Sequence, residues 1–168
     1  GRAPARLAPI FMPRIWGARN LSPLFPERSH EPEPIGEAWL TGNECRFVTG
    51  EFAGHMLGEV WPSFPEEWTG TRLRALQNIP LLVKFIFPEE KLSVQVHPDD
   101  EYAGQHEAAT GGVGKTEMWY VISAREGAEL RVGLRPDVTR ESFSRAIVDG
   151  TVENCLASVA VRAGDSVF

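Results

Sequence analysis

The sequence predicts a mainly β protein, built as a sandwich or barrel with a few helices appended. Short runs of β-branched and aromatic residues recur between glycines and prolines, and only three stretches carry helix start and stop signals. Hydrophobic residues make up 42% and charged residues 24% of the 168 residues. This composition is typical of a globular protein rather than a disordered chain, and the length fits one domain, 1–168.

The first 36 residues are rich in proline, which removes a backbone hydrogen-bond donor and fixes φ. We therefore expect this irregular segment to cover a core rather than to join the interior of a sheet. Residues 37–79 should supply short strands and a helix, and residues 80–168 a second set of strands. The expected strands are Ala38–Leu40, Arg46–Thr49, Leu81–Phe87, Lys91–His97, Lys115–Ile122, Glu129–Gly133, Val159–Val161 and Ser166–Phe168.

The three helix predictions depend on capping residues. Residues 63–77 begin with a serine as N-cap and a proline in the first turn. Residues 99–109 begin with an aspartate cap, and we interpret Asp99 and Asp100 as capping residues rather than metal ligands. Residues 139–149 begin with a threonine cap and end at Gly150, where a left-handed residue is favoured.

The net charge and the cysteine content restrict the classes of binding partner and the cellular compartment that we expect. The net charge of −6 disfavours nucleic acid and anionic membranes as partners. No stretch is long and apolar enough for a membrane helix, and the N-terminal residues have no apolar core of a signal peptide. Cys45 and Cys155 match no metal or redox spacing, so we expect two free thiols in the reducing cytoplasm.

Strand alternation brings out a set of polar side chains. In an extended 91–97, Ser93, Gln95 and His97 share one face, because residues two apart point the same way. In 115–122 the corresponding face carries Lys115, Glu117 and Trp119. Imidazole, carboxylate and carboxamide groups are suitable ligands for a Lewis-acidic metal, and the lack of thiolates argues against a structural zinc. A plain solvated strand face remains the alternative at this stage.

The wider pattern resembles the type I mannose-6-phosphate isomerases of the cupin superfamily, in their short bacterial form. The resemblance rests on LSVQVHPDDEYA at 92–103 and GKTEMWYVI at 114–122, with LLVK at 81–84 upstream. IWG at 15–17 and IGEAW at 35–39 match the N-terminal elements of that form. It implies a cupin-type jelly-roll barrel that interconverts mannose 6-phosphate and fructose 6-phosphate through a cis-enediol.

The resemblance also implies roles for individual residues. Gln95, His97 and Glu117 would bind one Zn²⁺ per chain. Ser93, Lys115, Lys84 and Glu37 would belong to the sugar-phosphate pocket, with the two lysines holding the phosphate or moving protons. Among the tryptophans, most of which we interpret as packing residues, Trp16 and Trp119 are the candidates for pocket walls.

The family pattern continues beyond Phe168 into a segment that supplies a fourth zinc ligand, a histidine, and then a catalytic arginine. The chain ends before both, so we expect a C-terminally incomplete barrel from a truncated chain, a proteolytic fragment or a shortened gene, and the activity of this 168-residue form is in question. His30, His55 and His106 are not convincing replacements for the missing ligand.

Two other functions stay open from the sequence. One is another metal-dependent cupin enzyme, such as an iron oxygenase, although a Gln-x-His pair with a nearby lysine does not favour iron. The other is a non-catalytic cupin that binds sugar phosphates. A homodimer is a further possibility that the sequence does not decide.

Overall fold

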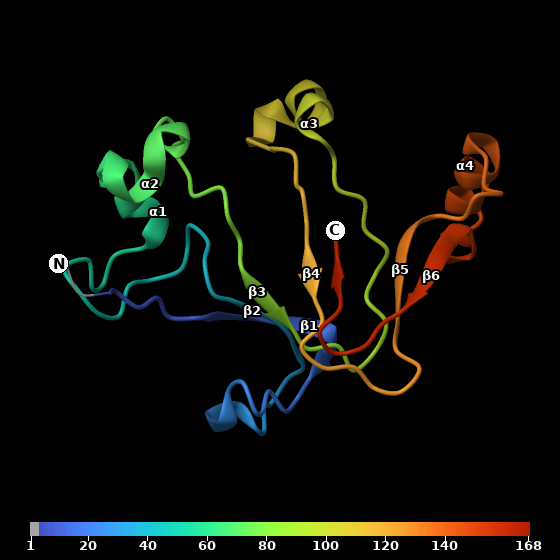
Figure 1. The fold of residues 1–168 in the computed structure, drawn as a ribbon, viewed down its shortest axis with the longest axis horizontal. Helices are drawn as coiled ribbons and strands as arrows, with labels where there is room; N and C mark the ends of the chain where they lie inside the picture. The colour runs from blue at the N-terminus through green and yellow to red at the C-terminus, as the bar shows by residue number, and fades with distance from the viewer. Residues whose placement is uncertain (1–3) are drawn as a thin grey trace. The chain divides into compact units, whose positions relative to one another are not determined.

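The computed structural model describes residues 4–168 (Figure 1). The chain divides into two compact units, the first ending at Ser93 and the second running from Val94 to Phe168. Each unit has its own strands and helices. The expectation of one domain over 1–168 stays a prediction.

The first unit is built around one three-stranded antiparallel sheet in the order β1-β2-β3. Glu37 in the central strand lies opposite Met12 on one side and Ile86 on the other. Two short α-helices and two 3₁₀ helices (η) complete the unit. Its elements are β1 (Ile10–Ala18), η1 (Pro26–Arg28), β2 (Ile35–Trp39), α1 (Leu57–Val60), η2 (Trp61–Ser63), α2 (Glu66–Leu73) and β3 (Lys84–Ile86).

Strand β1 corrects the prediction that residues 1–36 form an irregular segment. Pro13 lies within this strand, at a point where the pairing with β2 shifts register. β1 is also an edge strand, and proline is tolerated at edges and bulges because no ladder hydrogen bond is needed from its nitrogen. The expectation that the prolines stay out of the sheet interior holds for Pro13, because β1 is an edge strand.

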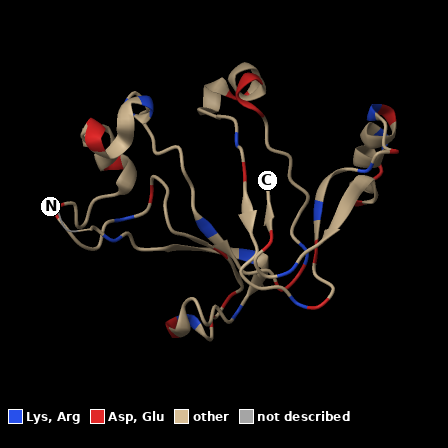
Figure 2. Ribbon diagram, in the orientation of Figure 1, with Lys and Arg blue, Asp and Glu red and all other residues tan. Residues whose placement is uncertain are grey.

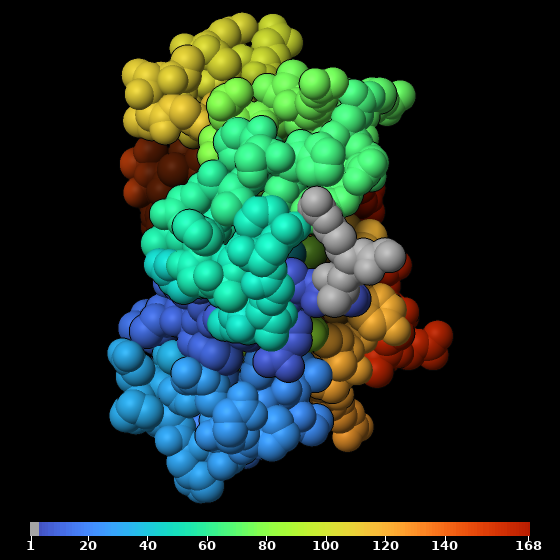
Figure 3. Space-filling view, turned by 90° about the vertical axis from the view of Figure 1, so that its left-hand side faces the viewer, coloured from blue at the N-terminus to red at the C-terminus, as the bar shows by residue number. Residues whose placement is uncertain are grey.

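Two apolar clusters form the core of the first unit. Ala18, Leu21 and Ile35 are buried together, with aromatic rings of Phe11, Phe25 and Phe87 packed against them. The second cluster joins Phe47, Leu57 and Val60 to the partly buried residues Leu7, Phe52, Phe64 and Ile79. In Figure 3 the segments that carry α1 and α2 (teal to green) form one continuous surface of this unit.

The helix predicted at 63–77 is shorter than expected. The Ser63 hydroxyl donates to the Val60 carbonyl at 2.6 Å, so Ser63 ends η2 instead of capping the next helix. Helix α2 begins after Pro65 and ends at Leu73, and Gly70 inside it has a non-helical φ of 73°. The predicted serine cap was therefore wrong, because the hydroxyl bonds backward to a carbonyl rather than forward to an amide.

The second unit carries two separate two-stranded sheets and two helices with well-formed caps (Figure 1). The Asp99 side chain accepts from the Tyr102 amide at 2.7 Å, and the Thr139 hydroxyl accepts from the Ser142 amide at 3.2 Å. Both predicted caps are confirmed, as is the left-handed Gly150 with φ 69°. The elements are α3 (Asp100–His106), η3 (Ala108–Thr110), β4 (Trp119–Tyr120), β5 (Glu129–Leu134), α4 (Arg140–Val148), η4 (Val152–Cys155), β6 (Leu156–Ala160) and β7 (Ser166–Val167).

The strands that carry the candidate ligands are not formed as predicted. No part of 91–97 is a strand, and of 115–122 only Trp119–Tyr120 pairs, with β7. Alternation of side chains does not by itself make a strand, since the backbone groups also need a partner ladder. Across residues 4–168 the strands make one three-stranded and two two-stranded sheets, not a closed barrel.

Both cysteines are free thiols, as the sequence predicted, and the structure shows that both are buried. Burial raises the pKa of the Cys45 thiol, with a further contribution from the nearby Glu44 carboxylate. The Cys45 Sγ is 3.7 Å from the Trp39 carbonyl, to which it donates.

The close approach of β1 to β2 generates a test of this packing. A Cβ added at Gly17 would lie 2.3 Å from the Ile35 carbonyl carbon, so Gly17→Ala should destabilise the chain by about 1–3 kcal/mol. Gly104→Ala is the control, because open space surrounds that position in α3 and alanine there should stabilise by about 0.5–1 kcal/mol. Urea unfolding of both variants measures the difference, and equal effects would contradict the packing.

Candidate functional site

Two of the three predicted metal ligands come together in the second unit. His97 Nε2 lies 3.2 Å from Glu117 Oε2, and Lys115 Nζ lies 3.9 Å from the other oxygen of the same carboxylate. The His97 and Glu117 side chains are 25% and 27% exposed, so solvent and small ligands still reach them. The pair therefore offers an imidazole nitrogen and a carboxylate oxygen at one accessible point.

The backbone holds the two stretches together just beside this pair. The Lys115 amide donates to the Pro98 carbonyl at 3.0 Å, and the Gly114 amide donates to Asp100 Oδ1 at 3.0 Å. An open pocket of about 270 Å³ lies at this junction. It is lined by His97, Pro98, Asp99, Asp100, Gly114, Lys115 and Thr116.

The side chains of His97, Glu117 and Gln95 are of types that bind divalent metals. Imidazole and carboxylate are common zinc ligands, and Gln95 is two residues before His97 in the same stretch. No group of three or more His, Cys, Asp and Glu side chains within residues 4–168 is arranged to hold a metal. The candidate set consists of His97, Glu117 and the carboxamide of Gln95. That all three bind one ion remains a prediction.

A second polar cluster lies on the sheet of the first unit. Glu37, in the centre of β2, is 7% exposed, and its Oε2 accepts from Trp39 Nε1 at 2.7 Å. Lys84 Nζ from β3 donates to Oε1 at 3.4 Å, and Arg14 Nη2 from β1 is 3.6 Å from Oε2. All three strands thus contribute a hydrogen-bond donor or a cation to one buried carboxylate.

The electrostatics of Glu37 follow from these neighbours. Burial on its own would raise the pKa of this carboxyl, but the Trp39 hydrogen bond and the charges of Lys84 and Arg14 lower it below its ordinary value of 4.5. Glu37 is therefore an anion at neutral pH, and it fixes the Lys84 ammonium in place. The sequence reasoning found Glu37 and Lys84 but missed Arg14 and Trp39 as partners.

Of the remaining predicted pocket residues, Trp16 and Ser93 are in the first unit, and Trp119 is in β4 of the second unit. Trp16 is 8% exposed and packs over Gly36, since a Cβ added there would lie 2.7 Å from the indole Cη2. Ser93 is the last residue of the unit. The structure thus groups Glu37 with Lys84, and His97 with Glu117 and Lys115, while substrate contacts by Trp16 and Ser93 stay predictions.

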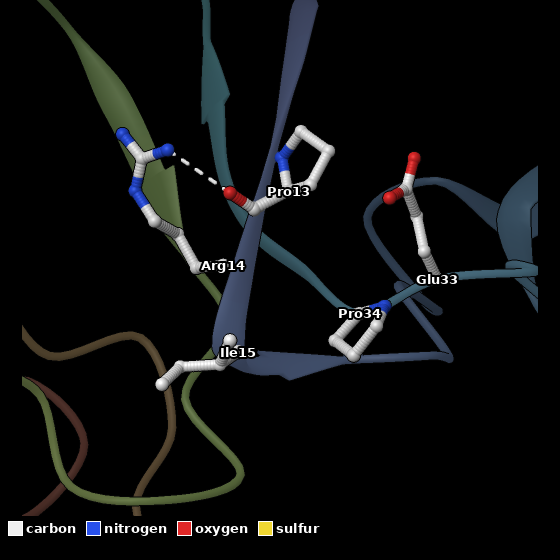
Figure 4. Close-up of a pocket in the computed structure, with 5 residues that line it drawn as sticks. All are labelled: Pro13, Arg14, Ile15, Glu33 and Pro34. Carbon is white, nitrogen blue, oxygen red and sulfur yellow. Dashed lines mark hydrogen bonds between the residues drawn. The ribbon is translucent and has the colours of Figure 1, made fainter.

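A shallow pocket of about 310 Å³ lies on the first unit beside Arg14 (Figure 4). It is lined by Pro13, Arg14, Ile15, Glu33 and Pro34. Figure 4 shows Arg14 and Glu33 on opposite sides of Pro13, and Arg14 Nη1 donates to the Pro13 carbonyl at 2.9 Å. The two charged groups do not converge on one point, so this pocket is a weaker candidate than the polar clusters.

Comparison with known proteins finds relatives that are all named as mannose-6-phosphate isomerases. No family model matches the sequence. The chain is 35% identical over 98% of its length to the probable mannose-6-phosphate isomerase GmuF of Bacillus subtilis, and 32% identical over 98% to ManA of that organism, a mannose-6-phosphate isomerase. A crystal structure of the mannose 6-phosphate isomerase from Bacillus subtilis matches 98% of the chain with a TM-score of 0.82 and 31% identity.

The resemblance to the mannose-6-phosphate isomerases is confirmed. The structural match also confirms the cupin-type fold class for this chain. The chain spans about half the length of the relatives it matches, 51% of both GmuF and ManA. Within residues 4–168, no helix is both long and apolar enough to cross a membrane.

The pKa of Glu37 leads to a prediction about pH. A carboxyl whose pKa is lower in the folded than in the unfolded state stabilises the fold above its unfolded pKa, and this stabilisation is lost as the pH falls through the folded value. Glu37→Gln should therefore destabilise the chain at pH 7, and the gap from wild type should shrink as the pH is lowered below 4.5. Urea unfolding across this range measures the gap, with Glu27→Gln as a control on an exposed carboxyl of the same unit. A gap independent of pH would contradict the electrostatic role.

Proposed function

We propose that the protein interconverts mannose 6-phosphate and fructose 6-phosphate as an aldose–ketose isomerase. The observation that carries the proposal is the match of 98% of the chain, at 35% identity, to a relative named as a probable mannose-6-phosphate isomerase. The adjacent His97 and Glu117 side chains support it from the structure. Because the chain spans about half of that relative, the proposal concerns the complete gene product.

Gln95, His97 and Glu117 are the residues proposed to hold the metal, one Zn²⁺ per chain. The bound ion would act as a Lewis acid that polarises the sugar oxygens. The 3.2 Å separation of His97 and Glu117 supports the assignment, since a nitrogen and an oxygen donor already meet at one point. Gln95 joins them by its spacing of two residues from His97 and by the family resemblance.

The proposed substrate is an anionic sugar phosphate, and the net charge of −6 disfavours its approach except at local cations. Figure 2 shows acidic and basic residues interspersed along both units, so such cations are available. Lys115 and Lys84 are proposed to hold the phosphate or to move the proton between C1 and C2 of the sugar. Ser93, Glu37 and Trp16 are proposed to line the pocket, with Glu37 orienting Lys84 through the 3.4 Å contact.

The cellular setting is also part of the proposal. Two buried free thiols suit a reducing compartment, so we place the protein in the cytoplasm. Sugar phosphates are the partners proposed, without nucleic acid or membrane. A homodimer stays a prediction from the sequence.

The metal assignment predicts a loss of zinc on removal of a ligand. His97→Ala and Glu117→Gln should each weaken zinc binding by more than about tenfold, since even changes to groups that only orient metal ligands cost 10–100-fold. His106→Ala is the matched control, because this exposed histidine in α3 is not a proposed ligand. Metal content after equilibrium dialysis gives the answer. Wild-type zinc content in both ligand variants would refute the assignment.

The catalytic assignment predicts unequal roles for the three lysines of the chain. Lys115→Met should lower kcat by about 10²–10⁴-fold if the ammonium moves a proton, and Lys84→Met should raise KM or lower kcat. Lys91→Met replaces the remaining lysine, which is exposed, and should leave both constants unchanged. A coupled assay for fructose 6-phosphate on the complete gene product measures them. Similar losses in all three variants would contradict the specific roles.

A further inference from the structure

The two stretches that carry His97 and Glu117 lack the support that strands normally give each other. Neither stretch is part of a strand at these residues, so no ladder of hydrogen bonds sets their relative position. Yet a metal site requires each of its donors to lie within a few tenths of an ångström of the position that the coordination geometry sets. Some other contact must therefore fix the distance between these two side chains.

Two consecutive amides provide that contact. The Gly114 amide donates to Asp100 Oδ1 and the Lys115 amide to the Pro98 carbonyl, both at 3.0 Å. The two acceptor residues, Pro98 and Asp100, flank Asp99 and lie within three residues of His97 in the chain. With one such hydrogen bond, the backbone of 114–117 could still rotate about the bonded amide. Two adjacent hydrogen bonds also fix the direction of this backbone.

Both ends of this contact are themselves anchored. Asp99 caps α3 through the Tyr102 amide, and Ala103 in the first turn of that helix is completely buried. On the other side, Gly114 approaches so closely that an added Cβ would lie 2.4 Å from the Asp100 nitrogen and 2.6 Å from Asp100 Oδ1. Only glycine allows this approach, and its need here comes from space rather than from a left-handed φ.

We propose that Asp100 is a positioning residue: its carboxylate holds the Gly114–Lys115 backbone against Pro98 and so sets the distance between His97 and Glu117. The inference rests on the proposed role of these two residues as metal ligands. Asp100 itself is not a ligand. It acts through the backbone on the geometry of the donor pair.

Three variants of the chain test the proposal. Asp100→Ala removes the acceptor, and Asp100→Asn keeps an acceptor oxygen in the same place. Asp99→Ala is the matched control, because it removes the cap of the same helix and leaves the acceptor of the Gly114 amide intact. Each variant is examined without metal, by amide hydrogen exchange at Gly114 and Lys115 and by the nuclear Overhauser effect between His97 and Glu117. Each is then titrated with Zn²⁺.

Asp100→Ala should speed exchange at both amides by about tenfold or more, weaken the His97–Glu117 signal and weaken zinc binding by about 10–100-fold. Asp100→Asn should restore all three readouts to within about twofold of wild type. Asp99→Ala should lower the stability of α3 and change these readouts less than Asp100→Ala does, because the acceptor of the Gly114 amide remains. The proposal is overturned if Asp100→Ala leaves exchange and the His97–Glu117 signal unchanged, or if Asp99→Ala alters them equally.

The metal-free readouts keep this inference separate from the proposed function. If wild-type chain binds no zinc while Asp100→Ala still separates His97 from Glu117, the metal assignment fails and the positioning role of Asp100 stands. If zinc binds equally well to wild type and Asp100→Ala, the metal assignment stands and the positioning role fails.

Discussion

Two hydrogen bonds form the constraint on which the candidate metal site depends: the Gly114 amide donates to Asp100 Oδ1, and the Lys115 amide donates to the Pro98 carbonyl. Neither ligand-bearing stretch belongs to a strand at His97 or Glu117, so the 3.2 Å approach of these side chains has no ladder to maintain it. Buried or not, a hydrogen bond contributes only about 0.5–1.5 kcal/mol to stability. The importance of these bonds lies in geometry, because two successive amides fix both the position and the direction of the chain.

In the first unit, a regular sheet rather than two isolated hydrogen bonds brings charged side chains together. There a regular antiparallel sheet places Arg14, Glu37 and Lys84 on three neighbouring strands, and their charged groups meet at one carboxylate. The sheet itself depends on close backbone approach, with Gly17 against Ile35 and Gly36 against Arg14 and Trp16. Larger residues at these glycines would separate β1 from β2 and would move Arg14 away from Glu37.

The sequence predicted what depends on local chemistry and missed what depends on pairing. The Asp99 and Thr139 caps and the left-handed Gly150 were found because each acts within a few residues of itself. Strand β1 was missed because its register shift at Pro13 is defined only against β2. Arg14 could not be assigned to Glu37 for the same reason, whereas Trp39 could have been found, since residues 37 and 39 share a face of one strand. Asp100 was assigned to the helix cap together with Asp99, although the two neighbouring carboxylates have different partners.

The two glutamates with lysine neighbours illustrate how surroundings distinguish a fixed charge from an available ligand. Glu37 has its Oε2 bonded to Trp39 and its Oε1 bonded to Lys84, is almost fully buried, and has a lowered pKa. A metal or sugar that bound this carboxylate would have to displace its Trp39 and Lys84 donors, at the cost of leaving these partly buried groups unpaired. Glu117 is more exposed, its lysine contact is longer at 3.9 Å, and its nearest partner is an imidazole that is itself a metal ligand type. A cation bound between His97 and Glu117 would therefore replace their direct contact with two metal–ligand bonds. On this argument Glu37 serves to hold Lys84, and Glu117 is the carboxylate of the pair that suits metal binding.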